Sequence, residues 1–403
     1  MMEKPNSIAL VSAGYPPNMF GGIDTQTYDL AHALSAEKVA VTVFCGGSLK
    51  SPTCIPENDY LTIYRLPMAE IPPRVVWFQL QNISFLKNKL SDYDIIHTQH
   101  SSGSVYGLLK RKVGKPWVVS FHDHQLRRFI IPFKLKPWNL SPMDIAYYVA
   151  GYPLFELLTK MELKWADHYV ACGESGFLDY VRFSGMNLSK TTVIPNGIDL
   201  GKIFSILQSF KSKEEKDTED FITIFTCGRL YASKGIHFLL KAMPLVLKRF
   251  KNVRVKIFGK GPMYTKLMDL IKILGLQEIV RLEGHVPYER LICELDKCTL
   301  AVFPSMVEVG PSLAVMEAMA CKKTVVMFRY PFSTEVIDHL QTGFLVQPLD
   351  IRGLADAICL LIEDEKLRRN LGMKAYYKIL EKHDIRKIVK KYIDVYLKCI
   401  NNS

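Results

Sequence analysis

The sequence predicts an α/β fold built from two Rossmann-like domains and a helical tail. Short runs rich in β-branched and aromatic residues alternate with helical stretches, which is typical of parallel sheets with crossover helices. A charged segment around Lys211 interrupts the alternation, which then starts again. The 403 residues also suffice for about two domains. We therefore expect two facing domains with a cleft between them, and ligands beyond the carboxyl ends of the strands.

The first domain is expected at 1–203. Its expected strands are Ile8–Ser12, Val39–Cys45, Ile95–Thr98, Trp117–Phe121, His168–Ala171 and Thr192–Ile194. Its expected helices include Thr25–Leu34, Ser104–Lys110 and Glu174–Phe183. The polar, charged stretch Ser205–Asp220 predicts a surface linker or loop near the domain boundary.

The second domain is expected at 204–380. Its expected strands are Ile222–Cys227, Val253–Phe258, Ile279–Glu283, Leu300–Phe303, Thr324–Met327 and Phe344–Val346. Its expected helices include Ile236–Phe250, Met263–Leu274, Tyr288–Lys297 and Ser312–Ala320. Apolar residues at three- and four-residue spacing predict helix throughout Leu354–Lys398. We expect the last part, 381–403, to pack back on the first domain.

Composition narrows the class of protein. The formal net charge of +12 favours anionic partners. No nucleic-acid-binding module is recognisable, so a nucleotide diphosphate or an anionic membrane surface fits better. The nine cysteines are scattered without a Cys-x-x-Cys pair, which indicates small core residues in a reducing compartment. Neither a signal peptide nor a membrane-spanning stretch is evident, and we expect a cytoplasmic protein.

The strongest chemical signal follows the strand Ile222–Cys227. This strand runs into Gly228–Gly235, and a helix follows. A glycine at a strand exit lets the backbone approach a ligand closely. Arg229 and Lys234 can both reach a diphosphate, the arginine as a planar fork and the lysine as a point charge. Two solvated cations at a strand–helix turn would be the structural alternative.

A second strand exit repeats this arrangement more weakly. Gly259 and Gly261 follow the strand Val253–Phe258, and glycine commonly serves such turns for structural reasons alone. The pattern is not the longer dinucleotide fingerprint, which disfavours a dehydrogenase.

The third signal is a pair of glutamates around a helix start. Glu308 lies in the loop after Leu300–Phe303, and Glu317 lies more than one turn into the following helix. That helix is expected to begin near Pro311 or Ser312, and its N-terminus offers N–H groups and partial positive charge to a phosphate. Glu317 could accept hydrogen bonds from ribose hydroxyls and Glu308 from sugar hydroxyls. Two ordinary surface glutamates are the alternative, although the flanking helix is otherwise apolar.

Together these segments resemble glycosyltransferase family 4, the retaining transferases with the GT-B fold. The resemblance extends over nearly the whole chain. In the first half it rests on Tyr15–Gly22, Asp94–His97, Phe121–His124 and Val193–Asp199. In the second half it rests on Gly228–Gly235, Ile257–Pro262, Gly284–Pro287, Phe303–Ala320 and Thr342–Val346.

The resemblance implies a role for each site residue. Arg229 and Lys234 would bind the donor diphosphate, Glu317 the ribose and Glu308 the donor sugar. His122 would lie near the transferred sugar, although a lone histidine after a strand is as often structural. The remaining donor-binding positions would be Gly21, Gly22, Gly228, Gly259, Gly310, Pro311, Ser312 and Leu313. The resemblance also implies retention at the anomeric carbon, no cofactor and no essential metal.

The chain departs from the family pattern at the glutamate pair. Eight residues separate Glu308 from Glu317, where the family usually has seven. Either a one-residue insertion keeps both roles, or Val309 occupies the first position and the sugar contact changes. Lys322 and the segment Pro331–Glu335 replace usual glycines, which leaves the donor sugar undefined.

The segment that could bind the acceptor has two possible interpretations. Basic and aromatic residues interleave in Arg127–Trp138, and the aromatic stretch Ile145–Leu158 follows. Such a segment could rest on an anionic membrane or line a groove for a lipid-linked acceptor, or it could be a buried helix with cationic flanks. Soluble glycans are equally compatible as acceptors. The functional alternatives are a sugar-nucleotide epimerase of the same fold and a non-catalytic nucleotide-sugar-binding subunit.

Overall fold

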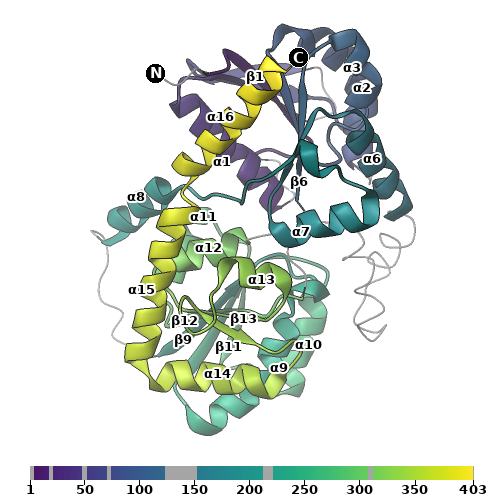
Figure 1. The fold of residues 1–403 in the computed structure, drawn as a ribbon. Helices are drawn as coiled ribbons and strands as arrows, with labels where there is room; N and C mark the ends of the chain where they lie inside the picture. The colour runs from purple at the N-terminus through teal and green to yellow at the C-terminus, as the bar shows by residue number, and fades with distance from the viewer. Residues whose placement is uncertain are drawn as a thin grey trace. The chain divides into compact units, whose positions relative to one another are not determined.

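The computed structural model describes residues 4–17, 21–47, 52–69, 74–122, 152–211, 221–306 and 312–402. Their contacts divide them into two compact units (Figure 1). Unit 1 contains residues up to Gly197 and the segment from Ile385 to the end, and unit 2 spans Ile198–Asp384. The chain thus leaves unit 1, forms unit 2 and returns with its last helix.

Unit 1 is built on a mainly parallel sheet. Its described strands number eight, in the order β3-β4-β2-β1-β5-β6-β7-β8, and only β3 and β4 pair antiparallel. The strands are β1 (Ser7–Ser12), β2 (Ala40–Gly46), β3 (Thr53–Asn58), β4 (Leu61–Leu66), β5 (Ile95–Gln99), β6 (Trp117–Phe121), β7 (His168–Ala171) and β8 (Thr191–Val193). The β3–β4 hairpin was not predicted, because every residue of β3 is exposed and shows no hydrophobic alternation.

Helices cover both faces of this sheet. Alternate residues of β1 show the division, since Leu10 belongs to the core under α1 and α16 and Val11 to the core under α2 and α3. The helices are α1 (Gly22–Ala36), α2 (Arg74–Lys89), α3 (Tyr106–Val113), α6 (Tyr152–Trp165), α7 (Glu174–Asp179) and α16 (Ile385–Asn401). Short helical turns occur at η1 (Leu90–Asp92), η4 (Tyr180–Ser184) and η5 (Leu188–Lys190).

Unit 2 has a second parallel sheet, with described strands in the order β11-β10-β9-β12-β13-β14. They are β9 (Ile222–Cys227), β10 (Val253–Phe258), β11 (Val280–Gly284), β12 (Leu300–Phe303), β13 (Val325–Phe328) and β14 (Phe344–Val346). Its helices are α8 (Leu200–Lys211), η6 (Ala232–Lys234), α9 (Ile236–Arg249), α10 (Tyr264–Ile273), α11 (Tyr288–Lys297), α12 (Leu313–Ala320), α13 (Pro331–Val336), α14 (Ile351–Glu363) and α15 (Glu365–Lys382).

The predicted linker at Ser205–Asp220 is wrong in its first part. Residues up to Lys211 belong to α8, because Ile203 and Ile206 are buried in the core of unit 2. Residues 212–220 lie outside the described part of the chain. The helical tail is three helices, α14, α15 and α16, of which only the last belongs to unit 1.

Candidate functional site

The exit of β9 is shaped by glycines that no other residue could replace without strain. Gly228 has a φ of 139° and Gly259 a φ of 134°. A Cβ on Gly259 would lie 1.9 Å from the carbonyl oxygen of Gly228, so the two strand exits touch through their backbones. A Cβ on Gly228 would lie 3.9 Å from Cε of Lys234. The lysine side chain therefore passes close to the glycine at the strand exit.

Arg229 is held beside this turn. Its guanidinium carbon lies 5.3 Å from the centre of the Tyr231 ring, which orients the planar fork by a cation–π contact. The turn η6 then places Lys234, whose backbone N–H donates to the Tyr231 carbonyl at 3.1 Å. Two cations thus occur within one ordered turn at the carboxyl edge of the sheet, the edge at which its parallel strands end.

The same turn contacts the loop that leads to α12. Gly235 lies so close to Pro304 that a Cβ would stand 1.9 Å from the proline carbonyl oxygen. The Met306 N–H donates to the Ser233 carbonyl at 2.8 Å. The loop after β12 is therefore tied to the turn bearing Lys234. Its predicted site residues Glu308, Val309, Gly310 and Pro311 lie outside the described residues.

Glu317 is a buried carboxyl group inside unit 2. Helix α12 begins after Ser312, as predicted, and its first residue is Leu313. Glu317 is only 7% exposed, and this burial raises the pKa of its carboxyl to about 7. A hydrogen bond from the Tyr288 hydroxyl and the positive charge of Lys202 both act to lower that pKa. The Lys202 ammonium also lies 4.9 Å from the centre of the Tyr288 ring.

Lys202 and Tyr288 were not predicted as site residues. Tyr288 directly follows the family-like segment Gly284–Pro287, which could have drawn attention to it. Lys202 lies in α8, at the start of unit 2, and nothing in its sequence context indicates a contact with α12.

In unit 1, His122 follows β6 and is 2% exposed. Its Nε2 lies 2.7 Å from Oε1 of Gln99, the last residue of β5. This bond makes Nε2 the protonated nitrogen and leaves the lone pair on Nδ1. Gln99 was not predicted, and only the adjacency of β5 and β6 in the folded sheet brings it to His122.

A buried carboxylate fixes the chain just after Gln99. Glu162 of α6 accepts hydrogen bonds from His100 Nδ1 at 2.9 Å, the Ser101 N–H at 3.2 Å and the Ser104 hydroxyl at 2.8 Å. Both of its oxygens are therefore used, and the side chain is fully buried. Three donors from one short loop hold that loop in place, which supports the position of Gln99.

Gly21 and Gly22 of unit 1 lie beside a negatively charged side chain, whereas phosphate binding would favour positive charge. Gly22 begins α1, and the N–H of Gly21 donates to the Asp24 carboxylate at 2.9 Å. Asp24 is buried at this helix N-terminus. Its negative charge occupies the position that the helix dipole would offer to an anion.

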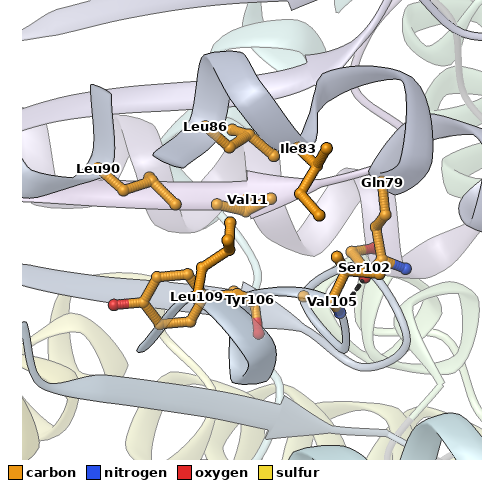
Figure 2. A pocket seen from close by; sticks show the side chains of 11 residues that line it. Val11, Gln79, Ile83, Leu86, Leu90, Ser102, Val105, Tyr106 and Leu109 are labelled. Carbon is orange, nitrogen blue, oxygen red and sulfur yellow. Dashed lines mark hydrogen bonds between the residues drawn. The ribbon is translucent and has the colours of Figure 1, made fainter. Parts of the chain in front are cut away.

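Two cavities, one in each unit, do not coincide with these residues. The cavity in unit 1 has a volume of about 10 Å³, is lined mainly by apolar side chains of α2, α3 and β1, and has room for at most one water (Figure 2). A larger hollow of about 460 Å³ in unit 2 lies between β14 and α14. None of the predicted site residues lines either one.

Two further observations concern metals and membranes. In the described ranges, no group of three or more His, Cys, Asp or Glu side chains is placed to hold a metal ion. None of the helices that the structure describes is both long and apolar enough to span a bilayer.

Comparison with known proteins identifies the class. Residues 20–202 match the model of glycosyltransferase family 4, and residues 208–378 match that of glycosyl transferases group 1. The chain therefore belongs to the family 4, group 1 glycosyltransferases, and it is a transferase of the GT-B fold that uses nucleotide sugars. The predicted family, fold class and enzyme class are confirmed.

Individual relatives extend over the whole chain. An uncharacterised glycosyltransferase of Methanocaldococcus jannaschii is 24% identical over 402 residues, covering 97% of this chain and 98% of the relative. The glycogen synthase of Mycobacterium tuberculosis is 23% identical, covering 97% and 94%. Among solved structures, sucrose-phosphate synthase from Thermosynechococcus elongatus has a TM-score of 0.80 at 20% identity, covering 99% and 100%. Anabaena HepE in complex with UDP and glucose has a TM-score of 0.72 at 19% identity, covering 97% and 98%.

Proposed function

We propose that this protein transfers a hexose, with retention of anomeric configuration, from a UDP- or GDP-linked donor to a hydroxyl group of a glycan or lipid-linked acceptor. The observation that carries the proposal is the ordered turn at the exit of β9. It presents Arg229 and Lys234 in one turn, with the Lys234 side chain passing close to the Gly228 backbone. The Anabaena HepE structure is a complex with UDP and glucose, which supports a UDP-linked hexose as the first donor to test.

The proposed chemistry follows from where charge develops. When the bond between the anomeric carbon and the β-phosphate oxygen breaks, negative charge builds on that phosphate and the sugar acquires oxocarbenium character. Arg229, Lys234 and the N-terminus of α12 would stabilise the charge, because they are positioned before the reaction begins. The departing phosphate would take the proton of the acceptor hydroxyl on the same face of the sugar.

The other site residues would orient the donor. Glu317 would accept hydrogen bonds from the ribose hydroxyls, and Glu308 or Val309 would adjoin the donor sugar. His122 would accept a hydrogen bond from a hydroxyl group of the sugar through Nδ1, since Gln99 keeps the proton on Nε2. The remaining proposed contacts of the donor phosphates are Gly21, Gly22, Gly228, Gly259, Gly310, Pro311, Ser312 and Leu313. At Gly21 and Gly22 the phosphate would have to approach beside the buried Asp24 carboxylate.

The decisive experiment replaces one cation and leaves the fold intact. Lys234→Ala should lower turnover on the order of 10²- to 10³-fold, the usual cost of losing one such electrostatic group. Lys248→Ala is the matched control, because that exposed lysine lies at the far end of α9, the same helix that follows the turn. Turnover by Lys234→Ala within a few-fold of the control would refute the proposed role.

Two other functions stay testable in the same assay. A nucleotide-sugar epimerase would convert the donor with no acceptor present. A non-catalytic binding subunit would bind the donor without forming product. Screening UDP- and GDP-linked sugars by thermal shift identifies the donor first, because a ligand that binds only the native state raises the melting temperature.

A further inference from the structure

We propose that one face of unit 1 docks on an anionic membrane surface. The face is formed by the exposed sides of α2, α3 and α6, which contact one another in sequence and lie side by side (Figure 1). We call it the α2–α3–α6 face. It includes the exposed apolar residues Trp77, Leu80, Leu108 and Leu157 and the cations Lys87, Lys89, Arg111, Lys112, Lys160 and Lys164.

Each helix of this face exposes large apolar side chains to water. Leu80 of α2 is 52% exposed, Leu108 of α3 is 61% exposed and Leu157 of α6 is 57% exposed. Single exposed leucines are ordinary on a protein surface, but three adjacent helices that each present one form a candidate contact surface.

The positions of these residues along the helices form a consistent pattern. Crossover helices run antiparallel to the strands of a parallel sheet, so all three helices begin near its carboxyl edge. The exposed apolar residues lie in the first half of each helix, and the exposed cations lie toward the end. One end of the face is therefore mainly apolar, with Arg74 at the start of α2 as its cation, and the other is basic. The apolar end lies toward the edge at which β6 delivers His122.

The charge of this face is strongly unbalanced. The three helices carry eight Lys and Arg residues and two carboxylates, Glu156 and Glu162. Of the eight cations, Lys110 is paired with Asp167, which follows α6. Glu162 is fully buried and bound by three donors, and Glu156 accepts a hydrogen bond from Ser184. Arg111 and Lys164 lie over the same Trp165 ring, at 5.6 and 5.1 Å from its centre, which gathers positive charge where α3 and α6 end.

Charge alone does not select this face. Helix α16, on the opposite side of the sheet, also exposes lysines, including Lys390 and Lys391. The described residues of α16 include no large exposed apolar side chain, whereas every helix of the α2–α3–α6 face has at least one. A bilayer with anionic headgroups matches both properties, because leucine side chains can enter the acyl boundary while lysines contact lipid phosphates. Nucleic acid would match only the charge.

The test measures co-sedimentation of the full-length protein with phosphatidylcholine vesicles, with and without phosphatidylglycerol. The wild type should bind the vesicles that contain phosphatidylglycerol and release them as salt is raised. Leu80→Gln/Leu157→Gln should weaken this binding at least about tenfold by removing apolar insertion. Lys112→Gln/Lys160→Gln should weaken it about fivefold for each cation lost and reduce its dependence on salt.

Matched variants serve as controls. Lys390→Gln/Lys391→Gln removes the same charge from the opposite face and should leave binding within about twofold of the wild type. Ile273→Gln removes a 79% exposed apolar residue from unit 2 and should have no effect. All these positions are exposed, and thermal unfolding verifies that each variant is folded.

Three results would overturn the proposal. The first is equal binding to both kinds of vesicle. The second is equal loss of binding in the α16 and the Lys112/Lys160 variants. The third is retention on RNA or heparin without vesicle binding, which would assign the face to a polyanion. None of these results depends on transferase activity, so the docking proposal and the proposed function can fail separately.

Discussion

The protonation state of Glu317 should make donor binding depend on pH near neutrality. Burial raises the pKa of this carboxyl to about 7, and ribose hydroxyls donate best to the ionised form. The carboxyl is about one-tenth ionised at pH 6 and about nine-tenths ionised at pH 8. The dissociation constant of a nucleotide sugar should therefore fall about tenfold over this range.

The choice of ligand and variant separates the effect of Glu317 ionisation from other pH effects. Both phosphates of a nucleotide sugar are esterified, so the charge of the ligand does not change in the window. Glu317→Gln keeps the shape and can still accept the Tyr288 hydrogen bond, but it cannot ionise. Calorimetric titration of this variant should show weaker binding that no longer depends on pH.

Glu317→Gln should increase the stability of the protein at pH 8, although it weakens donor binding. A folded-state pKa above the unfolded value of 4.5 means that stability is fully present below that value and is lost as pH rises toward 7. The loss amounts to about 3 kcal/mol once the carboxylate is ionised. At pH 8, Glu317→Gln should thus raise the free energy of unfolding by on the order of 2 kcal/mol while it weakens donor binding. Equal pH dependence of affinity in wild type and variant, or a variant less stable at pH 8, would refute the reasoning.

Three further outcomes can be measured by denaturant unfolding. Gly259→Ala should cost more than about 3 kcal/mol, because its Cβ would collide with the Gly228 carbonyl, whereas Gly275→Ala, with a φ of 66° and open space, should cost only about 1 kcal/mol. Tyr396→Phe should cost about 1 to 2 kcal/mol, since it removes the hydroxyl 2.7 Å from Nδ1 of buried His97. Burial lowers the pKa of His97 to about 3, so this group should make stability fall as pH drops from about 6.5 toward 3. Glu317 acts with the opposite sign between about 4.5 and 7, so the profile is measured in Glu317→Gln, where a flat profile would contradict this.

Much of the fold could be predicted because buried parallel strands are continuous apolar runs. The predicted bounds of β6 and β9 agree with the structure residue for residue. Strand β3 lacked such a signal, since it is exposed throughout and contains Pro56. Helix α8 was mistaken in part for a linker, because the charged residues after Lys211 outweighed the apolar spacing before it.

The residues of the candidate site could likewise be predicted only in part. Gly228, Arg229 and Lys234 could be predicted together because one strand exit holds them within a few residues. The partners of Glu317 could not, since Lys202 and Tyr288 reach it from separate helices only after unit 2 has folded. Gln99 is likewise adjacent to His122 only through the pairing of β5 with β6.

The polar contacts of α16 suggest why unit 1 keeps tyrosines and a histidine in its core. This helix returns to unit 1 after the whole of unit 2, so chain connectivity alone does not fix its register. His97 bonds to Tyr396 at 2.7 Å and to Ser120 at 2.7 Å, and Tyr392 lies 3.4 Å from the same serine. A sliding helix would keep most of its apolar burial but would leave these buried groups without partners, at about 1 to 3 kcal/mol each. Hydrophobic burial therefore attaches α16 to the sheet, and the hydrogen bonds select a single register.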